Sequence, residues 1–205
     1  MTKAKPAQLQ GLRAGLRGLC MYARYVLALV RPGRLVPTYL PAEEFNTDLS
    51  KWSEDELGVL IDEGRRQFDA QTDSLEKIRG RAQWLFSLAL ALTGADAALA
   101  AKVFPHPTCA QLAAWVASIV FTSWSALGAA SIITVTAQLA GVATGPLSRY
   151  APPIKRQLAT DYAEILDVGE QTVNTRLTLY RQAVVWLILG GYAALATLLL
   201  AQYSV

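Results

Sequence analysis

Three long apolar runs, at about residues 84–101, 112–143 and 183–201, constrain the fold of this chain more than any other feature. Each is close to the roughly 20 residues of helix that cross a hydrocarbon core of about 30 Å. A soluble core can hold one such run. Three of them, in a chain of 205 residues that is 53% hydrophobic, would leave too little amphipathic structure to cover them. The sequence therefore predicts an all-α integral membrane protein with three transmembrane helices and long cytoplasmic juxtamembrane helices.

Basic residues near the ends of these runs predict the orientation, because Lys and Arg are retained on the cytoplasmic side. They cluster before the first run and between the second and the third. The 102–111 loop has only Lys102, and the tail after the third run has no charged residue. We therefore expect a cytoplasmic N-terminus and an external C-terminus. Cys20 and Cys109 would then lie on opposite sides of the membrane, which excludes an intrachain disulfide, although Cys109 could bridge to a second subunit.

Residues 1–34 are predicted to form a basic amphipathic helix that ends near Pro32-Gly33. Leucines and valines occupy most of its circumference, and one narrow face carries a basic stripe of Arg13, Arg17, Arg24 and Arg31. Such a helix can lie in the interface of an anionic leaflet. The alternative is that it packs on the rest of the protein and exposes a solvated stripe. Residues 35–53 are predicted to be a linker.

A capping box begins a long helix at residue 54, because Ser53 is followed three residues later by Glu56. No proline occurs from there to Pro105, so this helix should run from a cytoplasmic segment, 54–82, directly into the first span. Apolar residues on that segment recur in alternating steps of four and three, as in a coiled coil. They form a helix-assembly seam that includes Leu57, Ile61, Phe68, Leu75 and Ile78. We expect the seam to pair with another helix, in the same chain or in a neighbouring subunit.

The remaining segments are a transmembrane hairpin at 83–143, a cytoplasmic loop and helix at 144–182, and a third transmembrane helix at 183–205. The second long helix should begin after Pro152-Pro153 and continue to about Tyr203. Both long helices approach the membrane from the cytoplasm, so their cytoplasmic halves should run parallel. In the third span, Gly190 and Ala194 are spaced as a small-residue pair that favours close helix packing.

Asp96 is the residue that most suggests a function, because it stands inside the first apolar run. A carboxylate at the bilayer centre costs about 2.5–3.5 kcal/mol on insertion scales, so such residues usually face a bundle interior or water. One interpretation makes Asp96 part of an ion pathway or a gating contact. The other ends the span near Gly94 and leaves Asp96 at the outer boundary. The second run carries Ser118, Thr122 and Ser125 on one helical face, a pattern that fits an aqueous path or close helix packing.

Patterns typical of catalysis or metal binding do not occur. His106 is the sole histidine, and only Cys109 accompanies it as a second potential metal ligand. The chain has no phosphate-binding glycine loop, nucleotide fingerprint or nucleophile elbow. We therefore predict no enzymatic activity, no metal and no cofactor. The small net charge of +3 argues against a nucleic-acid partner.

Three features of the layout are shared with a known family. They are the capped helix start from Ser53 to Glu56, the membrane entry from Arg79 to Trp84, and the juxtamembrane helix from Tyr162 to Arg181. In this layout, over about residues 54–182, the chain resembles SLATT-type membrane effectors of bacterial antiphage systems. The third span and the N-terminal helix depart from the simplest two-span pattern. The resemblance implies a homo-oligomer of the bacterial inner membrane that opens a pore, or disrupts the membrane, when a cytoplasmic signalling partner or a nucleotide acts on it.

Other functions also fit the sequence. The main alternative is a non-conducting anchor or scaffold that recruits a cytoplasmic partner through its charged helices, and it predicts that Asp96 is dispensable. Further hypotheses are a small transporter or its accessory subunit, and a lysis or superinfection-exclusion protein of phage origin. The lipid bilayer is an expected partner under each of these hypotheses.

Overall fold

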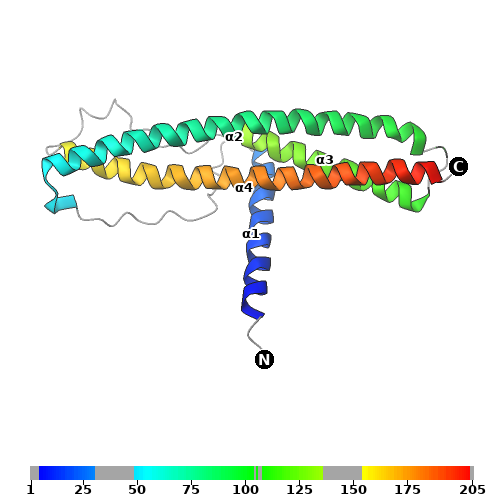
Figure 1. The fold of residues 1–205 in the computed structure, drawn as a ribbon, viewed down its shortest axis with the longest axis horizontal. Helices are drawn as coiled ribbons and strands as arrows, with labels where there is room; N and C mark the ends of the chain where they lie inside the picture. Colours follow the sequence, from blue (N-terminus) through cyan, green and yellow to red (C-terminus); the bar gives the residue numbers. More distant parts are fainter. Residues whose placement is uncertain (1–4, 31–48, 104, 106–107, 136–153, 204–205) are drawn as a thin grey trace. The chain divides into compact units, whose positions relative to one another are not determined.

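The computed structural model describes residues 5–30, 49–103, 105, 108–135 and 154–203, which form four long α-helices (Figure 1). These are α1 (Lys5–Val30), α2 (Glu54–Val103), α3 (Cys109–Thr134) and α4 (Ile154–Tyr203), and a short 3-10 turn, η1 (Leu49–Lys51), precedes α2. No β-strand occurs in the part of the chain that is described. The predicted all-α class is therefore confirmed.

The capping box that starts α2 forms as predicted. The backbone N–H of Ser53 donates to the Glu56 carboxylate over 2.7 Å, and the Glu56 N–H donates to the Ser53 hydroxyl over 3.3 Å. Glu54 and Asp55 add negative charge at the same helix N-terminus. The helix then continues to Val103, which confirms a single helix from the charged segment into the first apolar run.

Helix α3 begins and ends earlier than the apolar run at 112–143 indicates. Thr108 and Gln111 form a capping box, in which the Gln111 N–H donates to the Thr108 hydroxyl and the Thr108 N–H donates to the Gln111 side chain. Val135 has an extended backbone, so the helix ends at Thr134. Residues 136–143 of the predicted span lie outside the described residues. Arg79 of α2 stabilises this end, because its guanidinium donates to the Ile133 carbonyl over 2.9 Å.

The described chain divides into two compact units, and α2 and α4 each contribute one half to both of them. Unit 1 comprises Met1–Val36, Ile78–Val135 and Leu177–Val205, and unit 2 comprises Pro37–Lys77 and Thr136–Arg176. The predicted start of the second long helix after Pro152-Pro153 is confirmed, since α4 begins at Ile154.

In unit 2, α2 and α4 run parallel, as the sequence predicts. Their polar contacts advance in the same direction: Lys155 Nζ lies 3.0 Å from Glu54 Oε2, and Gln71 donates to the Leu166 carbonyl over 2.9 Å. A small apolar core holds the start of this pair together and consists of Leu49, Leu57, Ile61 and Ala159, with Trp52, Leu60, Leu158 and Tyr162 packed around it.

In unit 1, α3 runs antiparallel to the second halves of both α2 and α4. Arg79 contacts Ile133 at one end of the α2–α3 pair, and Asp96 contacts Ser118 further along it. The helices α2, α3 and α4 are each long and apolar enough to cross a membrane. This agrees with a multi-pass membrane protein.

Candidate functional site

Asp96 lies at the point where the three apolar helices of unit 1 meet. Its side chain is fully buried, and α2 continues for nearly two further turns, to Val103. The Ser118 hydroxyl of α3 lies 2.7 and 2.9 Å from the two carboxyl oxygens of Asp96. The same hydroxyl lies 3.0 Å from the Gly190 carbonyl oxygen of α4. Side-chain and backbone groups of three helices thus converge on one carboxyl.

Trp115 fixes the backbone of α2 beside this carboxyl. Its indole N–H donates to the Asp96 carbonyl oxygen over 2.8 Å, one helical turn of α3 away from Ser118. Trp115 is half-buried, and this bond supplies an acceptor for its indole N–H. The α2–α3 pair is therefore joined by both the main chain and the side chain of Asp96.

Polar side chains of α3 recur every seven residues and donate to backbone carbonyls of α4. Gln111 donates to the Leu200 carbonyl over 3.0 Å, and Ser125 donates to the Ala183 carbonyl over 2.8 Å. Ser118 is the middle member of this ladder. Interhelical hydrogen bonds of this kind contribute about 0.6 kcal/mol each within membranes. The ladder sets the rotation of α3, so that its polar face meets α4.

Small residues allow α3 and α4 to approach closely. A Cβ atom at Gly190 would lie 2.6 Å from the Thr122 methyl and 3.2 Å from the Thr122 backbone nitrogen. Thr122 itself donates its hydroxyl to the Ser118 carbonyl over 2.9 Å and is fully buried. Ala194, the second member of the predicted small pair, is also buried. Ser118, Thr122 and Ser125 therefore all lie inside the bundle, and their role in a pore stays a prediction.

Large apolar side chains point outward from the same three helices. Trp84 is 79% exposed, and further exposed side chains include Leu88 and Leu90 on α2, Val116 and Val120 on α3, and Ile188, Leu195 and Leu199 on α4. The interior contains many small or polar residues, such as Ala82, Ala89, Ser125, Ala129 and Ala183, beside larger ones that include Leu85, Ile132 and Leu179. Lipid-facing helices have this distribution, since packing there depends on small residues rather than on hiding apolar surface from water.

No protein-family model matches the chain, and no curated protein or solved structure matches it either.

Helix α1 docks on α3 through Tyr22. The Tyr22 hydroxyl donates to the Trp124 carbonyl oxygen over 2.8 Å, and the two rings lie 5.9 Å apart, centroid to centroid. A Cβ atom at Gly128 would overlap the Tyr22 phenol, so this glycine is needed for the contact. Burial raises the pKa of Tyr22, which keeps its hydroxyl a donor. Nothing in the sequence pattern of α1 distinguishes Tyr22 from its neighbours.

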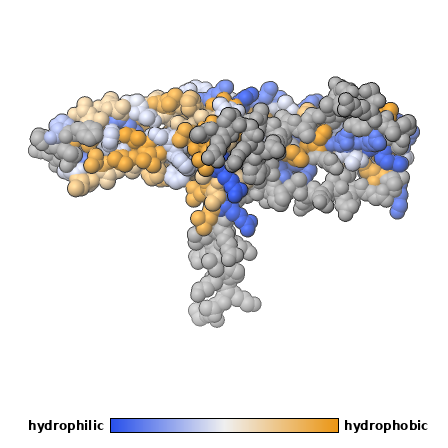
Figure 2. Space-filling model, turned by 180° about the vertical axis from the view of Figure 1, so that it is seen from behind, coloured by the Kyte–Doolittle hydropathy of each residue, from blue (hydrophilic) through white to orange (hydrophobic). Residues whose placement is uncertain are grey.

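The exposed part of α1 is amphipathic. Arg17 and Arg24 are exposed, as are the apolar side chains of Leu16, Leu19 and Leu27. Figure 2 shows hydrophobic atoms along one edge of this segment and hydrophilic atoms along the opposite edge. The side chain of Arg13 and the whole of Arg31, the other two members of the predicted stripe, lie outside the described residues.

The predicted helix-assembly seam of α2 faces inward. Leu57 and Ile61 pack against α4 of the same chain, and Leu75 and Ile78 are also buried. Phe68 is only half-buried. Gly64 accommodates the Tyr162 ring, because a Cβ atom at that position would lie 3.1 Å from it. Sequence alone left the partner of this seam open, and in the structure its start pairs within one chain.

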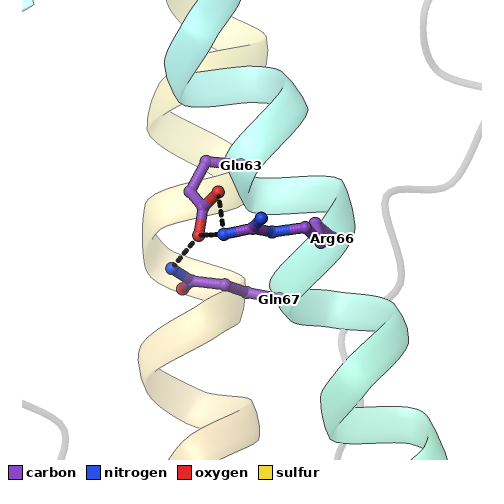
Figure 3. Close-up of polar contacts among 3 residues, drawn as sticks. All are labelled: Glu63, Arg66 and Gln67. Carbon is purple, nitrogen blue, oxygen red and sulfur yellow. Dashed lines mark hydrogen bonds and ion pairs between the residues drawn. The ribbon is translucent and has the colours of Figure 1, made fainter.

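A surface groove of about 400 Å³ lies in unit 2 and is lined by Trp52, Glu56, Val59, Leu60 and Glu63. Val59 is 70% exposed there. Glu63 accepts hydrogen bonds from Gln67 over 2.9 Å and from Arg66 over 3.0 Å (Figure 3). These two hydrogen bonds lower the pKa of Glu63, and the bond from Gln67 has the larger effect. Hydrogen bonds from Ser53 likewise lower the pKa of Glu56. The groove is thus apolar with an anionic rim.

Among the described residues, no three metal-capable side chains come together. His106 lies outside these residues, and Cys109 and Cys20 are both free and exposed.

The lowered pKa of Glu56 makes the start of α2 sensitive to acid. Because its folded pKa lies below the ordinary value of 4.5, its stabilising effect is present above that value and is lost as the pH falls through the folded pKa. We expect amide hydrogen exchange over residues 54–58, corrected for intrinsic rates, to speed up in that range. Ser53→Ala should show faster exchange already at neutral pH, with a weaker response to acid. Equal pH responses in the two proteins would contradict the capping mechanism.

Proposed function

We propose that this protein is a multi-pass protein of the bacterial inner membrane that acts as an oligomeric pore-forming or membrane-disrupting effector. The observation that carries the proposal is Asp96, a fully buried carboxyl held by three apolar helices. Ionisable side chains within membrane helices are expensive to insert, and they usually mark ion pathways or gating contacts.

Insertion into a membrane is supported by the outward-facing apolar side chains of α2, α3 and α4. Exposed apolar surface on this scale would cause aggregation in water, whereas lipid tails accommodate it. Arg79 contacts the C-terminal end of α3, and Trp84 is exposed little more than one turn later on α2. Such an Arg–Trp sequence is typical of the cytoplasmic membrane interface.

Conduction by this chain requires movement and more than one copy. The hydroxyl groups of α3 are engaged inside the bundle, and three helices cannot enclose a pore of their own. Separation of α4 from α3 would expose the polar ladder and Asp96. Because α2 and α4 pass through both compact units without a break, a partner or nucleotide acting on unit 2 has a continuous helical connection to this site. Oligomer contacts must use surfaces other than Leu57 and Ile61, which already pack on α4.

Asp96→Asn tests this proposal directly. Expression of the intact chain should depolarise cells that carry a potential-sensitive dye, and the variant should lose most of this effect while it still inserts into the membrane. The matched control is Asp73→Asn, because Asp73 is an exposed carboxylate of α2 that pairs with Lys77 at 3.3 Å. Depolarisation by Asp96→Asn equal to that of the intact chain, at matched membrane levels, would remove the basis of the pore proposal.

A second candidate function is a non-conducting anchor that recruits a cytoplasmic partner, and the groove of unit 2 favours it. Its apolar floor and anionic rim suit a segment with apolar and basic side chains. Under this hypothesis Val59→Arg should abolish the effect of expressing the chain in cells, because the arginine fills the groove and its positive charge repels a basic partner segment. Asp96→Asn should leave that effect unchanged. The reverse pattern would exclude the anchor function.

A further inference from the structure

The hydroxyl group of Ser118 lies near more oxygen atoms than it can donate hydrogen bonds to. Its hydroxyl lies within 3.0 Å of three oxygen atoms, namely Oδ1 and Oδ2 of Asp96 and the carbonyl oxygen of Gly190. All three are acceptors if Asp96 is ionised, yet a serine hydroxyl has a single proton to donate. An ionised Asp96 would therefore compete with Gly190 for one proton.

Thr122 does not resolve this competition. Its hydroxyl also faces the carboxyl of Asp96. However, its single proton also has the Ser118 and Ile119 carbonyl oxygens of its own helix as competing acceptors, at 2.9 and 3.2 Å. The Trp115 indole N–H donates to the main-chain carbonyl oxygen of Asp96.

Among the charged side chains that the structure describes on the neighbouring helices, none is placed to balance a carboxylate here. The sequence of α3 from Cys109 to Thr134 contains no charged residue, and neither does that of α4 after Arg181. On α2 the nearest basic residues in sequence are Arg81 and Lys102, about 22 and 9 Å away along the helix axis. Tyr192, the titratable residue of α4 nearest Gly190, is exposed on the outside. An unpaired carboxylate in such surroundings takes up a proton rather than remain charged.

One added proton completes the network. If Asp96 is a carboxylic acid, its O–H donates to Ser118 Oγ and the Ser118 O–H donates to the Gly190 carbonyl oxygen. Each group then has a partner, and the chain of bonds crosses from α2 through α3 to α4.

We propose that Asp96, Ser118 and the Gly190 carbonyl form a proton-binding site that is occupied at neutral pH in the closed bundle. Loss of the proton would draw the Ser118 hydroxyl to the carboxylate and release Gly190, which loosens α4 from α3. The site holds a proton whether or not the protein conducts ions, so this inference goes beyond the pore proposal and can fail separately from it.

Infrared spectroscopy of the full chain in lipid nanodiscs tests the site. Asp96 is the only buried carboxyl among the described side chains, and exposed Asp and Glu residues are ionised at neutral pH. We expect the C=O stretching band of a protonated acid at neutral pH, lost in Asp96→Asn and retained in Asp73→Asn. Ser118→Ala should move the band to higher frequency, because the acid loses its acceptor, and this assigns the band even if Asp96→Asn folds poorly. Absence of the band from the intact protein, or its persistence in a folded Asp96→Asn variant, would overturn the proposal.

Discussion

Gly190→Val should destabilise the three-helix bundle by on the order of 3 kcal/mol, whereas Gly191→Val should leave its stability almost unchanged. A side chain at Gly190 would meet both the methyl group and the backbone nitrogen of Thr122, and the backbone cannot move aside without separating α3 from α4. Gly191 is the adjacent residue of the same helix, and a Cβ atom there meets nothing within 4 Å. The pair therefore separates the effect of packing from the effect of replacing a glycine in an apolar helix.

The comparison can be made by denaturant titration of purified protein in detergent, followed by circular dichroism. Separation of α3 from α4 in Gly190→Val would also break the hydrogen bond from Ser118 to the Gly190 carbonyl. The loss of stability in Gly190→Val should therefore exceed the loss in Ser118→Ala. Thr122→Ser removes the methyl group that lies nearest a side chain at position 190, so it should partly restore the stability of the Gly190→Ala variant. Equal stabilities for the valine variants at 190 and 191 would mean that α3 and α4 do not pack as described.

The sequence was most informative where local chemistry determines the backbone. The capping box at Ser53 and Glu56, the absence of proline up to Pro105 and the start after Pro152-Pro153 are local signals, and both long helices follow them. The C-terminal end of α3 was predicted less well. Apolar residues continue past Thr134, so hydropathy did not mark an end that the Arg79 guanidinium stabilises from another helix.

The candidate site was only partly predictable. Helical periodicity placed Ser118, Thr122 and Ser125 on one face of α3, and that face does meet α4. Periodicity cannot show which residue of another helix lies opposite, since that depends on how far each helix is rotated and shifted along its axis. The pairing of Asp96 with Ser118 and Gly190 therefore required the structure. A signal for Gln111 was present, because it follows Thr108 by three residues, the spacing of a capping box.

Tyr22→Ala should detach the C-terminal half of α1 from α3. Truncation of a fully buried aromatic side chain costs about 3–5 kcal/mol, and this one also loses its bond to the Trp124 carbonyl. Cys20 is an exposed thiol two residues away and accepts a spin label, once Cys109→Ser has removed the other thiol. We expect the label to be far more mobile in Tyr22→Ala than in the parent. Gly128→Val, which introduces a side chain where the Tyr22 phenol lies, should have the same effect without any change in α1.

The same label distinguishes contact with α3 from contact with lipid. If the exposed leucines of α1 lie in the interface and Arg17 and Arg24 meet anionic headgroups, each arginine should contribute about 1 kcal/mol of attraction to the surface. In anionic vesicles, the double variant Arg17→Glu and Arg24→Glu should make the label more accessible to a polar nickel reagent and less accessible to oxygen, with Tyr22 still in place. In neutral vesicles the same substitutions should have little effect. A label that responds to Tyr22→Ala but not to the charge reversal would mean that α1 packs on the protein and exposes its arginines to water.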